Sequence, residues 1–220
     1  QGTPAWLEFE QGKIFVSLEG KRVGDAEGYD EIKEFNSYEG KLLFQARKGK
    51  EWHTLLDGKE IHPPTRKKGM YQYFGMSEGQ LLFAKTETTN WIFKKTQTIQ
   101  VYHGETLLHE IDDPHVSKVE LVDIEEGHVA TKAWYSARKK KERPRIRTWM
   151  DGQPVGDPRG YIGVRVGRIG DKLACIVQNE ETTDEIFCLN GVEYPHIPGI
   201  TNFLGIGDDI FLTTFQCRYK

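Results

Sequence analysis

The stretch GKLLFQARKGKEWHTLLDGK, residues 40–59, is the clearest copy of a unit that recurs along this chain. Its apolar run Leu42-Leu43-Phe44 predicts a buried strand, and Asp57-Gly58 predicts a tight hairpin turn, because both turn positions need positive φ. The first glycine of the unit recurs at Gly40, Gly79, Gly127, Gly170 and Gly207, and the turn glycine at Gly20, Gly58, Gly104, Gly152 and Gly191. Five copies at a spacing of about 40 residues are typical of a repeat protein.

Each unit is predicted to form four short antiparallel strands, because strand signals are dense and no window carries the apolar spacing of a helix. The first strands are expected at residues 29–35, 70–75, 117–122, 161–167 and 200–205. The last unit has only the strands at 200–205 and 210–219, while the unmatched strands 13–18 and 21–23 lie at the other end. We therefore expect 210–219 to pair with 13–18, which would close a ring and hide two sheet edges.

These units resemble the propeller repeats in which an apolar strand follows Gly-Lys and a later strand ends in Asp-Gly-Lys. The resemblance covers nearly the whole chain from Gly12 onward. It implies an all-β fold, a single five-bladed β-propeller of four-stranded antiparallel blades formed by residues 1–220 as one domain. The blades are expected at about residues 29–61, 70–111, 117–157, 161–197, and 200–220 completed by 13–25. A two-sheet sandwich is the alternative, and it does not account for the split unit. The resemblance defines an architecture and no activity.

The composition limits the class of protein. Of the 220 residues, 37% are hydrophobic and 29% charged, which suits many half-exposed strands, and the net charge of −3 supplies no global field for nucleic-acid binding. No apolar run reaches the length of a bilayer span, and no leader segment is recognised. Because the chain begins with Gln1 rather than Met, earlier removal of a leader segment is an open alternative.

The three cysteines, Cys175, Cys188 and Cys217, lack the spacing of a metal site. Cys175 and Cys188 fall on consecutive predicted strands at equal distances from the hairpin centre, so they are expected to face each other. We expect buried free thiols, because a cross-strand disulfide would strain the usual geometry. An odd count without a disulfide framework favours a reducing compartment, and so the cytoplasm.

The hairpins of blades two and three are predicted to be the longest, and they are neighbours. From first glycine to turn glycine each spans 25 residues (79 to 104 and 127 to 152), against 18 in blade one (40 to 58) and 21 in blade four (170 to 191). Loops carry function more often than the scaffold does, so binding residues are expected on the face that these hairpins form.

Cations gather at the tip of the blade-three hairpin. They are Arg138, Lys139, Lys140, Lys141, Arg143, Arg145 and Arg147. This segment is either an anion-binding finger or a solvated tip whose like charges prevent association at sheet edges. The blade-two tip adds Trp91, Phe93, Lys94 and Lys95, where rings beside cations suit stacking on a partner, or else packing between blades. The connection after blade one adds Arg66, Lys67 and Lys68 to the predicted binding residues.

No catalytic constellation is recognised, and no metal or cofactor is predicted. His62, His115 and His196 recur between blades, but the prolines beside them favour rigid turns over a zinc site. Glycoside hydrolysis needs two carboxylates across a cleft, for which Asp30 and Glu120 are the candidates, with Trp91 or Tyr71 beside the sugar. Enzymes of that class typically carry acidic residues on the innermost strands of three blades, and this sequence does not match that arrangement.

The sequence therefore predicts a non-catalytic binding module that recognises a macromolecular partner on the face of the two long hairpins, where the basic tip suits an anionic partner. A protein is the favoured partner, and nucleic acid is a weaker alternative because the net charge is negative. The alternative function is a carbohydrate-binding lectin or a glycoside hydrolase with its site at the mouth of the central channel.

Overall fold

The structure, a computed structural model, describes ten stretches of the chain. They are residues 4–67, 70–91, 94–125, 128–137, 143–158, 160–169, 172–178, 185–194, 200–206 and 209–214. Within them the regular structure consists of strands, and no helix is present. This confirms the all-β class predicted from the repeats.

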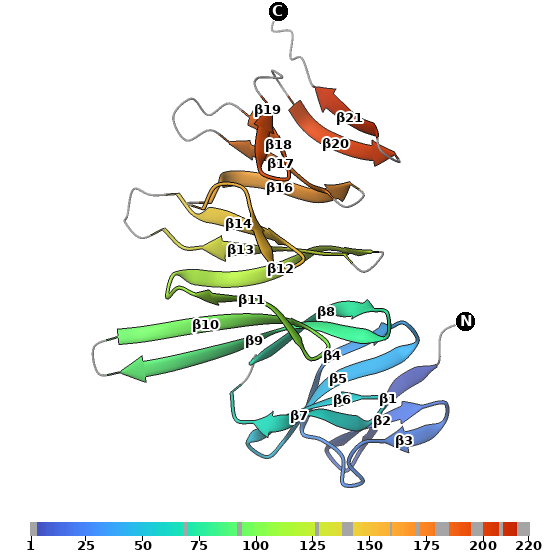
Figure 1. The fold of residues 1–220 in the computed structure, drawn as a ribbon. Coiled ribbons are helices and arrows are strands. Elements are labelled where there is room, and N and C mark those ends of the chain that lie inside the picture. The colour runs from blue at the N-terminus through green and yellow to red at the C-terminus, as the bar shows by residue number, and fades with distance from the viewer. Residues whose placement is uncertain are drawn as a thin grey trace, which may run out of the picture. The chain divides into compact units, whose positions relative to one another are not determined.

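The strands form antiparallel sheets that follow the chain (Figure 1). The first sheet contains β1 (Ala5–Glu10), β2 (Lys13–Leu18) and β3 (Lys21–Val23), and the second β4 (Glu31–Tyr38), β5 (Lys41–Lys48), β6 (Glu51–Leu56) and β7 (Lys59–Thr65). The third contains β8 (Tyr71–Ser77), β9 (Gln80–Trp91), β10 (Lys94–His103) and β11 (Thr106–Asp112), and the fourth β12 (Val116–Glu125), β13 (His128–Tyr135), β14 (Arg145–Met150) and β15 (Gln153–Val155). The fifth contains β16 (Ile162–Ile169), β17 (Lys172–Gln178), β18 (Glu185–Leu189) and β19 (Val192–Tyr194), followed by the pair β20 (Ile200–Ile206) and β21 (Asp209–Thr214). The four-stranded antiparallel unit is thus confirmed.

The first sheet corrects one predicted pairing. β2 is bonded on one side to β1, from Ala5↔Leu18 to Glu10↔Lys13, and on the other side to β3. The prediction that residues 13–18 pair with 210–219 is therefore wrong, because both edges of β2 are occupied. The apolar alternation of β1 was the missed signal, since Ala5 and Leu7 pack against the core beside it. Closure of a ring stays a prediction.

The chain divides by its contacts into two units, residues 1–79 and 80–220, which are described separately. In unit 1, the sheets β1–β3 and β4–β7 enclose an apolar core. Its buried residues are Val16, Tyr29, Leu42, Phe44, Ala46 and Leu55. They come from strands whose alternate side chains point to one face, so the apolar residues of both sheets meet between them.

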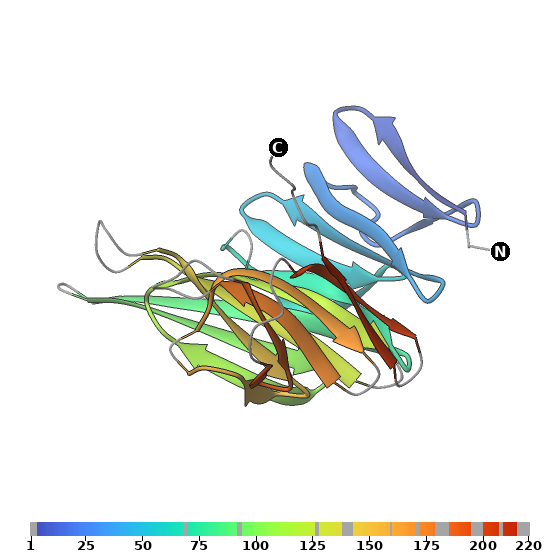
Figure 2. The same ribbon diagram turned by 90° about the horizontal axis from the view of Figure 1, so that it is seen from above.

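In unit 2, successive sheets lie face to face and overlap when seen from above (Figures 1 and 2). The sheets β12–β15 and β16–β19 share a core formed by Ala130, Met150, Tyr161, Leu173, Cys175, Val177 and Cys188. The strands of the β9–β10 hairpin have 12 and 10 residues, against 8 and 6 for β13 and β14.

A repeated tyrosine joint links one sheet to the next inside each unit. The sequence Val-Gly-Asp-x-x-Gly-Tyr occurs at residues 23–29 and again at 155–161. In unit 1 the Asp25 amide donates a hydrogen bond to the Tyr29 hydroxyl over 2.8 Å, and in unit 2 the Asp157 amide does the same to Tyr161 over 2.9 Å. Each tyrosine also exchanges two backbone hydrogen bonds with a strand of the preceding sheet, so the joint fixes the chain as it passes between sheets.

The two described cysteines confirm the predicted placement. Cys175 and Cys188 lie directly opposite each other on β17 and β18 as buried free thiols, and Cys217 lies outside the described residues. Burial raises the pKa of both thiols to about 12.

We expect these two thiols to resist Ellman's reagent in the folded protein. At pH 8 a pKa near 12 leaves only about one thiol in 10,000 as the reactive thiolate, and burial blocks access as well. A Cys217→Ser background isolates the pair, and labelling in guanidinium chloride provides the full signal for two thiols. Rapid labelling of the native variant would contradict the burial of this pair.

Candidate functional site

The predicted basic hairpin is formed by β13 and β14 in unit 2. These strands pair in unbroken register up to Tyr135↔Arg145. Opposite residues of an antiparallel pair share a face, so Arg145, Arg147 and Trp149 lie on the same face as Tyr135. Of the predicted cations, 138–141 lie outside the described residues. Among the predicted cations of this hairpin, the structure describes Arg143, which precedes β14, and Arg145 and Arg147 within β14.

The three arginines differ in their partners. Arg143, which is exposed, donates to the Gln178 side-chain oxygen over 3.2 Å, and Arg145 donates to the Gly160 carbonyl over 3.1 Å. Arg147 is half-buried and lies over two rings, with its guanidinium carbon 5.7 Å from the Tyr135 centroid and 5.8 Å from the Trp149 centroid. Among the described residues, no carboxylate forms an ion pair with Arg143 or Arg147. Their positive charge therefore remains available to an incoming anion.

An aromatic stack supports this face from the side of the third sheet. His109 on β11 lies flat on Trp149, with ring centroids 4.8 Å apart and planes inclined by 4°. Both rings are buried, and burial lowers the pKa of His109 to about 4, so the imidazole is neutral at physiological pH. Trp149 is thus held between His109 and Arg147. Sequence reasoning missed His109 and Trp149, since neither lies in a loop.

The three arginines of unit 1, and Lys48, behave differently. Arg22 bonds to Glu8 and Glu10, Arg47 bonds to Glu31, and Lys48 bonds to Asp25. Arg66, one of the predicted binding residues, lies 3.6 Å from Glu51. The amide of Lys67 donates to the Thr65 hydroxyl, and Lys68 lies outside the described residues. These ion pairs cancel most of the local field that the paired cations would otherwise produce.

The second predicted element, the blade-two tip, is only partly described. The backbones of β9 and β10 pair up to Trp91↔Lys94 and Asn90↔Lys95, so the hairpin does extend to the predicted residues. Phe93 and the side chains of Trp91, Lys94 and Lys95 lie outside the described part of the structure. The role of these four residues in binding stays a prediction.

The two carboxylates considered for sugar chemistry are both held by cations. Glu120 accepts hydrogen bonds from Lys118, from the Trp134 indole over 2.9 Å and from Lys132, and this environment lowers its pKa to about 2. Asp30 accepts hydrogen bonds from Lys13 over 2.6 Å and from the Gly49 amide, which lower its pKa as well. A general acid must hold a proton near neutral pH, so this environment does not favour either residue in that role.

The predicted histidines do not assemble a metal site in the described residues, where no cluster of three His, Cys, Asp or Glu ligands is found. His62 stacks on Tyr71 with ring centroids 4.4 Å apart, and the His115 amide donates to the Asp113 carboxylate. His196 lies outside the described residues. Stacking and turn contacts account for the two described histidines.

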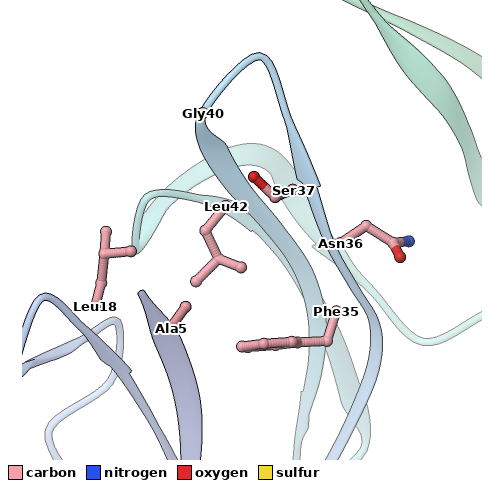
Figure 3. Close-up of a pocket in the computed structure, with 7 residues that line it drawn as sticks. All are labelled: Ala5, Leu18, Phe35, Asn36, Ser37, Gly40 and Leu42. Carbon is pink, nitrogen blue, oxygen red and sulfur yellow. The ribbon is translucent and has the colours of Figure 1, made fainter. Parts of the chain in front are cut away.

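Unit 1 also contains a hollow of about 240 Å³ beside the end of the β4–β5 hairpin (Figure 3). Ala5, Leu18, Phe35 and Leu42 supply apolar walls, and Asn36, Ser37 and Gly40 complete the lining. The lining carries no ionisable side chain, so the hollow offers no group for acid, base or metal chemistry.

The comparisons give no family for the chain: no protein-family model, curated protein or solved structure matches it. In the described part of the chain, no helix has the length and apolar character that crossing a membrane requires.

Proposed function

We propose that this protein is a non-catalytic binding module whose β13–β14 hairpin recognises an anionic macromolecular partner. The observation that carries the proposal is the contrast between two sets of arginines. In unit 1 the described arginines are bound to carboxylates, whereas Arg143 and Arg147 have no such partner among the described residues. A cation already in an ion pair must give up that pair to bind another anion, while an unpaired cation attracts the anion directly.

The sequence of the hairpin tip adds to this support. Arg138, Lys139, Lys140 and Lys141 precede β14 in the chain and belong to the same basic segment. A protein of net charge −3 has no general attraction for anions, so binding must come from such a local concentration of charge. The long β9–β10 hairpin, with Trp91 and Phe93 at its end in sequence, is the second arm of the proposed surface.

We also propose that the four-stranded sheets are blades of the propeller type. The repeated strand order in four sheets supports this, as does the tyrosine joint found between sheets in each unit. The proposal concerns the repeated unit, and the binding surface does not depend on closure of a ring.

Replacing Lys139, Lys140, Lys141 and Arg143 with serine should weaken binding to anionic polymers by about tenfold or more, because several charges that contact the polymer are lost together. The probes are a fluorescein-labelled polyglutamate peptide and a labelled single-stranded oligonucleotide, followed by anisotropy at several salt concentrations. Thermal stability should change little, since exposed charges contribute little to it.

A matched control removes four lysines elsewhere, at positions 21, 50, 59 and 172, which are exposed and take part in no described ion pair. It lowers the net charge by the same amount and should retain binding within about twofold. Equal losses in both variants, or full binding by the tip variant, would refute the hairpin as the binding surface. Preference for the peptide or for the oligonucleotide identifies the class of partner.

A further inference from the structure

Arg147 differs from the other half-buried arginines that the structure describes. Arg47 donates to the Glu31 carboxylate over 3.2 Å and to the Gly49 carbonyl over 2.9 Å, and Arg145 donates to the Gly160 carbonyl. Arg147 makes no ion pair with a described residue, and the Tyr135 hydroxyl is the one described acceptor near its guanidinium, which carries five N–H donors. A charged group that is half removed from water needs acceptors, so this side chain is prepared for a ligand that supplies them.

A second polar group beside Arg147 lacks an acceptor for its proton. The Tyr135 hydroxyl is buried, with the residue 8% exposed, and it donates a hydrogen bond to no described residue. Arg147 is opposite Ala133 in the β13–β14 register, which makes Tyr135 its diagonal neighbour across the strands. Burial raises the pKa of Tyr135, and the charge of Arg147 together with a hydrogen bond from its guanidinium opposes that rise. The hydroxyl therefore keeps its proton at neutral pH and can donate it to a ligand.

The neighbouring aromatic rings restrict the orientation of the Arg147 guanidinium. Its guanidinium lies between Tyr135 and Trp149, and Trp149 is itself held flat against His109 at 4.8 Å. A guanidinium placed over rings loses less conformational entropy when it binds, because its plane is already restricted. The Asp113 carboxylate makes only the smallest contribution to the pKa of Tyr135, and it forms no ion pair with Arg147.

We propose that Arg147 and the Tyr135 hydroxyl together bind a phosphate group of the anionic partner, an inference that rests on the proposed binding function of the hairpin. A guanidinium binds two oxygens of an oxyanion in parallel, which uses both oxygens of a carboxylate. A phosphate group has further oxygens that remain free to accept the tyrosine hydroxyl. The pair of donors therefore selects phosphate over carboxylate.

The test uses inorganic phosphate and acetate as probes, so that it does not depend on the polymer. Binding is followed in ¹H–¹⁵N NMR spectra at constant ionic strength, by the Arg147 Nε–Hε signal and by the backbone amide signals of β13 and β14, which are present in every variant. Phosphate should shift the Arg147 signal and saturate in the millimolar range, with acetate at least about fivefold weaker. Arg147→Lys keeps the charge but loses the paired donors, and it should weaken phosphate binding about tenfold.

Tyr135→Phe keeps the ring and should weaken phosphate about threefold or more while leaving acetate unchanged, because only phosphate has an oxygen for the hydroxyl. The matched control is Arg22→Lys, since Arg22 also lies over a ring, 4.1 Å from the Phe15 centroid, but is bound to Glu8 and Glu10. This control should bind phosphate like the wild type. Thermal melts of all variants establish that each is folded.

Unchanged phosphate binding by both Arg147→Lys and Tyr135→Phe would overturn the inference, as would equal affinity for acetate and phosphate. Neither result depends on the serine variant of the hairpin tip. If the tip variant retains polymer binding while Arg147→Lys loses phosphate, the proposed function fails and the phosphate site remains. If the tip variant loses polymer binding while Arg147→Lys keeps its phosphate binding, the hairpin binds its partner through the tip alone and the phosphate site is refuted.

Discussion

Replacing Gly152 with alanine should be among the most destabilising single substitutions in this protein. Gly152 lies in the turn between β14 and β15 with a φ of +79°, and a Cβ there would stand 2.2 Å from the Leu108 carbonyl oxygen and 2.8 Å from its carbonyl carbon. These are backbone atoms of β11 in the neighbouring sheet, so no side chain can rotate away. We expect the clash to lower the free energy of unfolding by about 3 kcal/mol or more, in addition to the cost of placing alanine at positive φ. Urea unfolding measures this difference.

Two other turn glycines separate the clash from the backbone strain. Gly20 has nearly the same φ, +78°, with no atom within 4 Å of the added Cβ, so Gly20→Ala should cost only about 1 kcal/mol. Gly104 would meet the flexible end of Gln80 at 2.4 Å, and its substitution should fall in between because that side chain can move. Similar losses at all three positions would mean that positive φ alone sets the cost and that the contact with Leu108 is not tight.

Stability should also fall as the pH is lowered from about 6.5 to 4 because of His109. The folded-state pKa is lowered by burial to about 4, from an ordinary value of 6.5, so the folded protein keeps this imidazole neutral. Below pH 6.5 the unfolded chain takes up a proton that the folded chain does not, and this favours unfolding until the folded form also protonates near pH 4. A shift of this size corresponds to roughly 3 kcal/mol over that range.

The variant His109→Leu isolates the effect. It removes the titrating group together with two buried ring nitrogens that have no hydrogen-bond partner among the described residues, so its stability at pH 7 should equal or exceed that of the wild type. The difference between the two proteins should then grow steadily as the pH falls from 6.5 to 4 in urea titrations. Parallel stability curves would contradict the prediction. The Glu120 carboxylate, whose pKa is about 2, contributes to acid unfolding mainly below this range.

The sequence by itself determined the unit of this fold. Apolar runs after Gly40 and Gly79 and turn pairs such as Asp57-Gly58 specify strands and turns through local backbone preferences, and the structure has them at these positions. Asp57, Asp151 and Asn190 adopt the positive φ that was expected of turn residues. The facing pair Cys175 and Cys188 was equally predictable, because the register of a short hairpin follows from its turn.

Only the tertiary structure decided which strand pairs with β2 and which cations remain available. Pairing depends on which edges meet in space, and Ala5–Glu10 lies closer along the chain to β2 than any C-terminal segment. Basic residues look alike in sequence, yet Arg47 lies beside Glu31 while Arg147 lies over Tyr135 and Trp149. The neighbours of an arginine therefore decide whether it can bind an anion. An adjacent carboxylate cancels the positive field of the guanidinium, whereas an adjacent aromatic ring does not.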